Sequence, residues 1–375
     1  MRKRLWVAGI LSVALASGAA RAETYVSDRA AALVVYPLVV ASPEAIGVDT
    51  LIQISNTSTE LAAVQCYYVT AVGSCSASGA PCLDIGSVNI GCPLDVDLCL
   101  PNWIETDFRI YITGRQPLGW AASEGLQAAD LPLDGVSIVG PTGQSNASTR
   151  VPPLQDFDSI GGIGELKCYV VNGDGTPSDR NVLKGEATLV STGGITDPGD
   201  SAKYNALGFR AIPGAVNDDN RLILGGPEAE YDGCPAVLIL NHFYDFAINP
   251  SAPAIFLTSL VLVPCTENFV NQVPTRVTAQ YLTFNEFEQR FSTSAPVDCF
   301  SFSLISLIDT PDPVRSIFSV FVAGTVAGQT RIRGVNGGLI GVALETSRGA
   351  VDSTDAFNLH VQGEREASDV VTVVQ

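Results

Sequence analysis

Apolar and polar residues alternate along most of this chain, with the two-residue period of a half-buried strand. In the clearest run, Ile104, Phe108 and Ile112 fall on one side, and Glu105 and Asp107 fall on the other. Similar runs occupy Leu33–Val40, Thr50–Ser55, Val64–Val69, Leu166–Val171, Val182–Val190, Arg221–Leu224 and Ala236–Leu240. Clusters of Gly, Pro, Asn, Asp and Ser separate the runs, and helical periodicity is confined to short pieces such as Ser123–Ala129. The pattern therefore predicts an all-β fold, in which Pro37 marks an edge strand or a broken one.

The order of the strands repeats weakly between the two halves of the chain. The first-half strands Tyr36–Val40, Thr50–Asn56 and Val64–Val69 correspond to Leu260–Pro264, Thr278–Asn285 and Val297–Phe302. This arrangement resembles bacterial immunoglobulin-like domains of exported proteins, and the resemblance implies two β-sandwich domains in tandem. The Gly- and Pro-rich stretch Ser191–Asp200 is the clearest break in composition. We therefore expect domains at 23–195 and 196–375.

The N-terminus has the three parts of a secretory signal peptide. A basic start, Met1–Arg4, precedes the apolar run Leu5–Ala19, and Ala20–Ala22 has the small-x-small form of a cleavage site. The apolar run is shorter than the roughly 20 residues of a spanning helix. We predict a signal peptide at 1–22 and no transmembrane segment in the mature chain. The protein is expected outside the cell or on the outer cell surface, with the periplasm as the alternative.

Composition and charge narrow the classes of partner. The chain has 375 residues, of which 46% are apolar and 16% are charged, so it can bury a core in each of two domains. Without the four basic residues of the leader, 17 basic residues face 39 acidic ones, a net charge of −22. Such a surface disfavours nucleic acid, because phosphate binding depends on Lys and Arg.

The cysteines predict a disulfide framework, since all nine follow the leader of an exported chain. Cys66 and Cys168 share the inward faces of their strands, and Cys234 with Cys265 would form a second bridge. Four more lie in a Cys-rich insert at 74–101, namely Cys75, Cys82, Cys92 and Cys99. One arrangement pairs each cysteine with its nearer neighbour, Cys75 with Cys82 and Cys92 with Cys99. Spacing alone does not determine the connectivity. Cys299 is the candidate free thiol. The chain has no Cys-x-x-Cys, which argues against a zinc knuckle or a redox motif.

Catalytic signatures are sparse in the sequence. It contains neither Gly-x-Ser-x-Gly nor His-Glu-x-x-His, and its two histidines are His242 and His360. His242 near Asp245 is either a base at a strand end or a hydrogen-bonded sheet residue. Glu286 and Glu288 lie two positions apart on a predicted strand. They are either the paired carboxylates of a glycosidase or solvated surface charges. Trp103 and Trp120 either stack on sugars or pack into the structure.

One acidic loop is a candidate calcium site. Asn172, Asp174 and Asp179 lie close together in the sequence, and calcium is bound by oxygen atoms in such loops. An EF-hand would need acidic residues where Val170 and Asn181 stand, so the alternative is a plain hairpin turn. No other cofactor is predicted.

These features favour a non-catalytic structural, adhesive or matrix protein that meets a protein or a glycan at the cell surface. The Cys-rich insert is the segment expected to touch the partner, because loops on a rigid scaffold carry recognition. The β-prone end Asp369–Gln375 would either add to the edge of another molecule or close its own sheet. The alternative function is a secreted carbohydrate-active hydrolase or a sugar-binding module that uses Glu286 and Glu288 or the two tryptophans.

Overall fold

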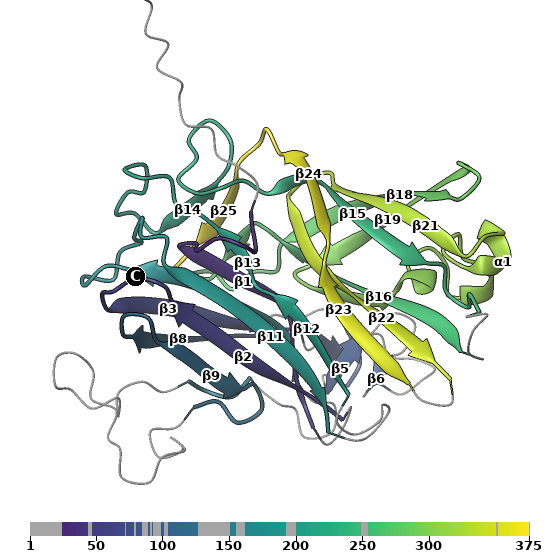
Figure 1. The fold of residues 1–375 in the computed structure, drawn as a ribbon, viewed down its shortest axis with the longest axis horizontal. Helices are drawn as coiled ribbons and strands as arrows, with labels where there is room; N and C mark the ends of the chain where they lie inside the picture. The colour runs from purple at the N-terminus through teal and green to yellow at the C-terminus, as the bar shows by residue number, and fades with distance from the viewer. Residues whose placement is uncertain are drawn as a thin grey trace, which may run out of the picture.

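The computed structural model describes most of the chain after the leader. The described segments are residues 25–43, 47–71, 73–78, 80–84, 89–90, 92, 99–100, 104–126, 151–154, 162–192, 200–248, 254–349 and 352–374. The predicted signal peptide, Trp103 and the predicted boundary between 195 and 196 lie outside them. Within them, strands dominate the chain, which confirms the all-β fold (Figure 1).

A nine-stranded antiparallel sheet, here called the large sheet, makes up most of the first half. Its strands run in the order β12-β11-β2-β1-β10-β3-β8, with β13 beside β1 and β9 beside β2. Their bounds are β1 Leu33–Ser42, β2 Val48–Asn56, β3 Ala62–Thr70, β8 Ile104–Ile112, β9 Pro117–Ala121, β10 Gly162–Val171, β11 Leu183–Ser191, β12 Ser201–Asn205 and β13 Leu207–Phe209. The sheet curves around a core to which β2, β3, β8 and β11 all contribute.

Pro37 lies in a central strand rather than at an edge. The pairing of β1 with β10 shifts register between Tyr36 and Val39, so the strand is broken at the proline. The Tyr204 hydroxyl from β12 binds both the amide and the carbonyl of Leu38. A side chain from another strand therefore satisfies the backbone groups that the break removes from the ladder.

The second half forms two further sheets, the central sheet and the outer sheet. The central sheet has the order β20-β16-β22-β23, and the outer sheet has the order β19-β18-β21-β15-β24. Their bounds are β15 Pro235–Phe243, β16 Ile255–Pro264, β18 Arg276–Asn285, β19 Arg290–Asp298, β20 Ser301–Leu304, β21 Ala327–Gly334, β22 Leu339–Arg348, β23 Ser353–Asn358 and β24 His360–Glu364.

The central sheet is buried on both faces. Along β16, Leu260 and Leu262 pack into the core shared with the outer sheet, whereas Val261 packs into the core of the large sheet. Figure 1 shows β16, β22 and β23 between β11 and β12 on one side and β15 and β21 on the other. Continuous apolar runs are typical of strands covered on both sides, because no face needs to be polar.

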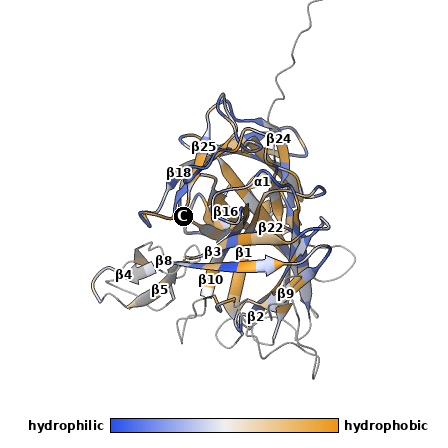
Figure 2. Cartoon of the chain, turned by 90° about the vertical axis from the view of Figure 1, so that its left-hand side faces the viewer, coloured by the Kyte–Doolittle hydropathy of each residue, from blue (hydrophilic) through white to orange (hydrophobic). Residues whose placement is uncertain are grey.

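Two small sheets complete the fold. One has the order β14-β25-β17, with β14 Arg221–Leu224, β17 Glu267–Asn268 and β25 Asp369–Thr372. The other lies in the Cys-rich insert and has the order β6-β5-β4-β7, with β4 Gly73–Cys75, β5 Pro81–Asp84, β6 Asn89–Ile90 and β7 Cys99–Leu100. Figure 2 shows β4 and β5 at the side of the body, next to β8.

Helix is minor in the described residues. The helical elements are the short α-helix α1 Val320–Ala323 and the 3-10 turns η2 Ile305–Leu307 and η3 Pro313–Arg315. No helix in this part of the chain is long and apolar enough to cross a membrane.

The two halves are more entangled than a tandem repeat implies. Strand β12 follows the predicted boundary but pairs with β11 of the large sheet. The repeat also differs in topology, because β1 pairs with β2, whereas their expected counterparts β16 and β18 lie in different sheets. A third core combines Tyr67 and Tyr169 from the large sheet with Val263 and Phe269 from later in the chain.

Candidate functional site

His242 and Asp245 have separate hydrogen-bond partners. The ring Nδ1 of His242 donates to the Phe243 carbonyl at 3.0 Å, and Nε2 accepts from the Thr330 hydroxyl at 2.8 Å. Asp245 accepts from the amide of Thr258 at 2.7 Å and from that of Ser306 at 3.1 Å. Burial lowers the pKa of His242 to about 4 and raises that of Asp245 to about 6. Both groups therefore hold strands and loops together.

Glu286 and Glu288 lie in the turn between β18 and β19, so the strand predicted for them is wrong. Glu288 has a positive φ of 61°, which breaks the alternation that would align the two carboxylates. Glu286 Oε2 accepts from the amide of Val326 at 3.2 Å. Trp120 is buried, and its ring nitrogen donates to the Tyr68 hydroxyl at 2.6 Å. His360 is the first residue of β24.

The acidic loop closes as a hydrogen-bonded turn. Asp174 Oδ1 accepts from both the amide and the hydroxyl of Thr176, and Asn172 donates to the Pro177 carbonyl. Asp179 instead accepts from the amide of Gly214, at 3.2 Å. The predicted ligands thus already have protein partners, and calcium remains a prediction here.

The structure pairs eight cysteines. Cys66 is bonded to Cys168 across the directly opposed strands β3 and β10, and Cys234 is bonded to Cys265. In the insert the bonds join Cys75 with Cys92 and Cys82 with Cys99, so the nearest-neighbour pairing is wrong. Cys82 stands opposite Gly73, so strand register does not bring it to Cys75. Register alone does not set the bonds either, because Cys75 stands opposite Cys99 and is bonded to Cys92.

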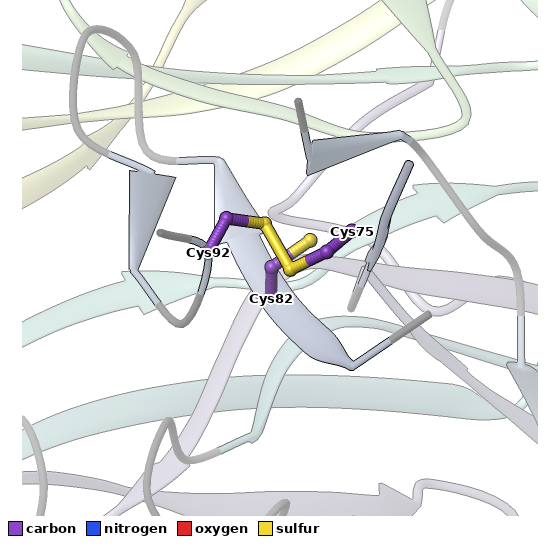
Figure 3. Close-up of side chains that lie close together, drawn as sticks. All are labelled: Cys75, Cys82 and Cys92. Carbon is purple, nitrogen blue, oxygen red and sulfur yellow. A yellow bond between two sulfur atoms is a disulfide. The ribbon is translucent and has the colours of Figure 1, made fainter. Parts of the chain in front are cut away.

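Sulfur atoms come close together in the insert. In Figure 3 the Cys75–Cys92 bond runs beside the sulfur of Cys82. The described residues also gather Cys234, Cys265 and Asp369. Metal binding needs thiolates, and these sulfur atoms are held in disulfides. Cys299 is free and buried, and burial raises the pKa of its thiol well above the usual range, which makes it inert.

Three charged side chains, Glu165, Lys167 and Glu267, form a buried ion triad. Lys167 Nζ lies 2.8 Å from Glu165 Oε2 and 2.6 Å from Glu267 Oε2. The exposed fraction of the side chain is 2% for Lys167, 0% for Glu165 and 2% for Glu267. The triad joins β10 of the large sheet to β17. In the sequence, the triad could have been suspected because Glu165 and Lys167 are charged residues two positions apart in an otherwise apolar strand.

Four apolar side chains at one end of the outer sheet are exposed, and we call them the apolar tip. Its members are Phe287, Phe321, Val322 and Val326. Phe287 is exposed by 71% and Phe321 by 65%. Figure 1 places α1, which carries Phe321 and Val322, at one end of the molecule. In the sequence, the feature that could have pointed to the apolar tip is Phe287, an aromatic residue between Glu286 and Glu288.

Backbone and side-chain bonds hold the tip in place. Asn285 Nδ2 donates to the Ala323 carbonyl at 2.9 Å, which ties the β18–β19 turn to the end of α1. The bond from Val326 to Glu286 ties the same turn to the start of β21. The apolar side chains are therefore presented by a fixed framework.

A cavity of about 380 Å³ lies between the large and central sheets. Leu38, Val40 and Ile163 line one wall, and Leu257, Phe302 and Leu344 line the other. Near its rim, Asp200 accepts from the amide of Thr354 at 2.9 Å. The size is that of a small-molecule pocket, but its walls are mostly apolar and define no particular ligand.

Comparison with known proteins places the chain in no family. No family model matches it, and no curated protein shows a significant match to it.

Proposed function

We propose that this chain is an exported, non-catalytic protein of structural or adhesive type that contacts a protein or glycan at the cell surface. The observation that carries the proposal is the apolar tip. Large aromatic side chains rarely stand exposed together on a soluble surface without a partner, and Phe is a frequent anchor in interfaces. Hydrogen bonds tie the segments that carry the tip to one another, so binding needs little further ordering of their backbone.

The rest of the molecule supports a scaffold role. Four disulfides cross-link it, and one of them spans a sequence separation of 102 residues. Disulfides of this kind are typical of proteins outside the cytoplasm. The hydrolase alternative would use Glu286 and Glu288 or the two tryptophans, of which Glu286 accepts from the amide of Val326 and Trp120 is buried. The other candidate pair, His242 and Asp245, binds groups within the strands and loops. The Cys-rich insert stays a second candidate contact surface.

The decisive experiment measures binding of the mature chain, 23–375, to a glycan array and to the surface fraction of the source cells. Replacing Phe287 and Phe321 with Ser should weaken retention at least about tenfold, because anchor side chains contribute about 2 kcal/mol or more each.

The matched control replaces Val273 and Val335, which are exposed by 59% and 53% outside the tip, with Ser. This control should bind like the wild type. If both double variants retain the partner equally, the tip is not the contact surface, and excision of the insert becomes the next test.

A further inference from the structure

The buried ion triad has an unbalanced set of charges. Glu165, Lys167 and Glu267 together carry two acids and one base in a site with almost no water access. The second oxygens of both carboxylates, Glu165 Oε1 and Glu267 Oε1, have no hydrogen-bond partner among the described residues. Buried carboxylates normally find partners for all their lone pairs. An ion pair alone therefore explains this site poorly.

Burial changes the protonation of the carboxyl group that would react. Burial, together with the charge of Glu165, raises the pKa of Glu267 well above its ordinary value. Burial also lowers the pKa of Lys167, but the two carboxylates outweigh it and raise that pKa overall. The Glu267 carboxyl therefore holds its proton, and the Lys167 amine must give a proton to a neighbouring base before it can attack. A neutral acid beside an amine is the reactant pair for amide formation.

We propose that Lys167 and Glu267 are joined by an intramolecular isopeptide bond, formed with Glu165 as the proton carrier. Glu165 accepts a proton from Lys167, and the free amine attacks Cδ of the protonated Glu267. The bond from Nζ to Cδ forms, and the bond from Cδ to its hydroxyl oxygen breaks as Glu165 returns the proton to that oxygen. The nitrogen then gives its second proton to Glu165, which ends neutral, and Nζ keeps the one hydrogen of the amide. One water molecule leaves. No oxidant or further reactant is required.

Geometry and environment both favour the condensation. The nitrogen lies 2.6 Å from a carboxyl oxygen of Glu267, and such fixed proximity replaces a bimolecular encounter. Phe269, two residues after Glu267, stacks on Tyr67 with ring centroids 4.1 Å apart, so aromatic rings exclude water nearby. The neutral amide removes two buried charges, which are costly to keep away from water.

The product would be a fifth covalent cross-link. It would join β10 of the large sheet to β17, across 100 residues of sequence. Lys203 and Glu186 offer a comparison, because they also form an ion pair, but on the surface, with side chains exposed by 50% and 37%. Water there stabilises the charges, and no bond is expected.

The test is the intact mass of the mature chain, 23–375, after all nine cysteines are reduced and alkylated. We expect a mass below that of the sequence by one water molecule. After trypsin digestion, we expect a branched peptide that joins residues 151–180, uncut at Lys167, to residues 222–276. Lys167→Arg should restore the full sequence mass, and the control Lys203→Arg should keep the loss.

The wild-type protein decides the question even if Lys167→Arg fails to fold. A full sequence mass with normal cleavage at Lys167 would overturn the proposal and leave a buried ion triad. A loss of water in a peptide without Lys167 would overturn it as well. Neither result depends on whether the apolar tip binds a partner.

Discussion

At the scale of single residues, the neighbours of a polar side chain decide its role. His242 has the residue type of a general base, but both ring nitrogens are bound within the sheet. Lys167 and Glu165 lie within a strand that is buried along its whole length, and a third residue from far along the chain completes their site. Residue type alone is therefore a poor guide to chemistry here.

The buried histidine predicts a pH dependence of stability. Its pKa is about 4 in the folded protein and 6.5 when exposed, so the unfolded state binds more protons between these values. Stability should fall as the pH drops through this window, by up to about 3 kcal/mol from this group. Urea denaturation at pH 7 and at pH 4 measures this change in the free energy of unfolding.

Asp245 acts in the opposite direction, because its pKa is raised to about 6 and its protonated form favours the folded state as the pH falls. The contribution of His242 is therefore the difference between the wild type and His242→Gln. The variant should lose less stability on acidification. An identical pH dependence in both proteins would contradict the prediction.

At the scale of elements, side chains from distant strands repair local defects. Pro37 has no amide hydrogen, yet β1 runs through the centre of the large sheet, and the Tyr204 hydroxyl binds the backbone of Leu38 at the break. The turn at Glu286 is likewise fixed by β21. The alternation of residues predicted the strand β1 but not its central position, which depends on its pairing with both β10 and β2.

Removing the Tyr204 hydroxyl should expose the defect in β1. Tyr204→Phe leaves the amide and carbonyl of Leu38 buried and unpaired, at a cost of about 1–3 kcal/mol for each group. We expect the free energy of unfolding to fall by about 2–6 kcal/mol, measured by chemical denaturation.

Tyr111→Phe is the control, because Tyr111 is exposed on β8. It should change stability by less than about 0.5 kcal/mol. Equal stability of the two variants would show that the hydroxyl of Tyr204 does not support β1.

At the scale of the whole molecule, sheets from both halves share their cores. The central sheet packs against the large sheet and the outer sheet, so unfolding one half exposes apolar surface on the other. The strand β25 is hydrogen-bonded to β14 and to β17, one on each side. It closes its own sheet, which is one of the two roles expected for this segment, and strand addition to another molecule stays a prediction.

The disulfides should differ in their effect on global stability. The Cys66–Cys168 bond lies in the core of the large sheet and closes a loop of about 100 residues, which is worth about 4–5 kcal/mol in the chain-entropy model. Replacing both cysteines with Ala should lower the unfolding midpoint reported by tryptophan fluorescence, measured in a Trp103→Phe background in which Trp120 is the one tryptophan of residues 23–375.

Replacing Cys75 and Cys92 with Ala is the matched control. This bond belongs to the small sheet of the insert and spans 17 residues. Its loss should unfold the insert locally and leave the midpoint of the large sheet unchanged. Equal shifts for the two double variants would mean that the insert and the large sheet unfold as one unit.

The alternation of side chains by itself determined the all-β class and most of the strands of the first half, because burial of one strand face is a local property. It also indicated Cys66 and Cys168 as inward neighbours. Only the tertiary structure decided which sheet each strand joins, how the insert cysteines pair, and that Lys167 meets Glu267. The strand pairings depend on register, the insert cysteines bond past their nearest neighbours, and Lys167 and Glu267 are 100 positions apart, so no local pattern records these contacts.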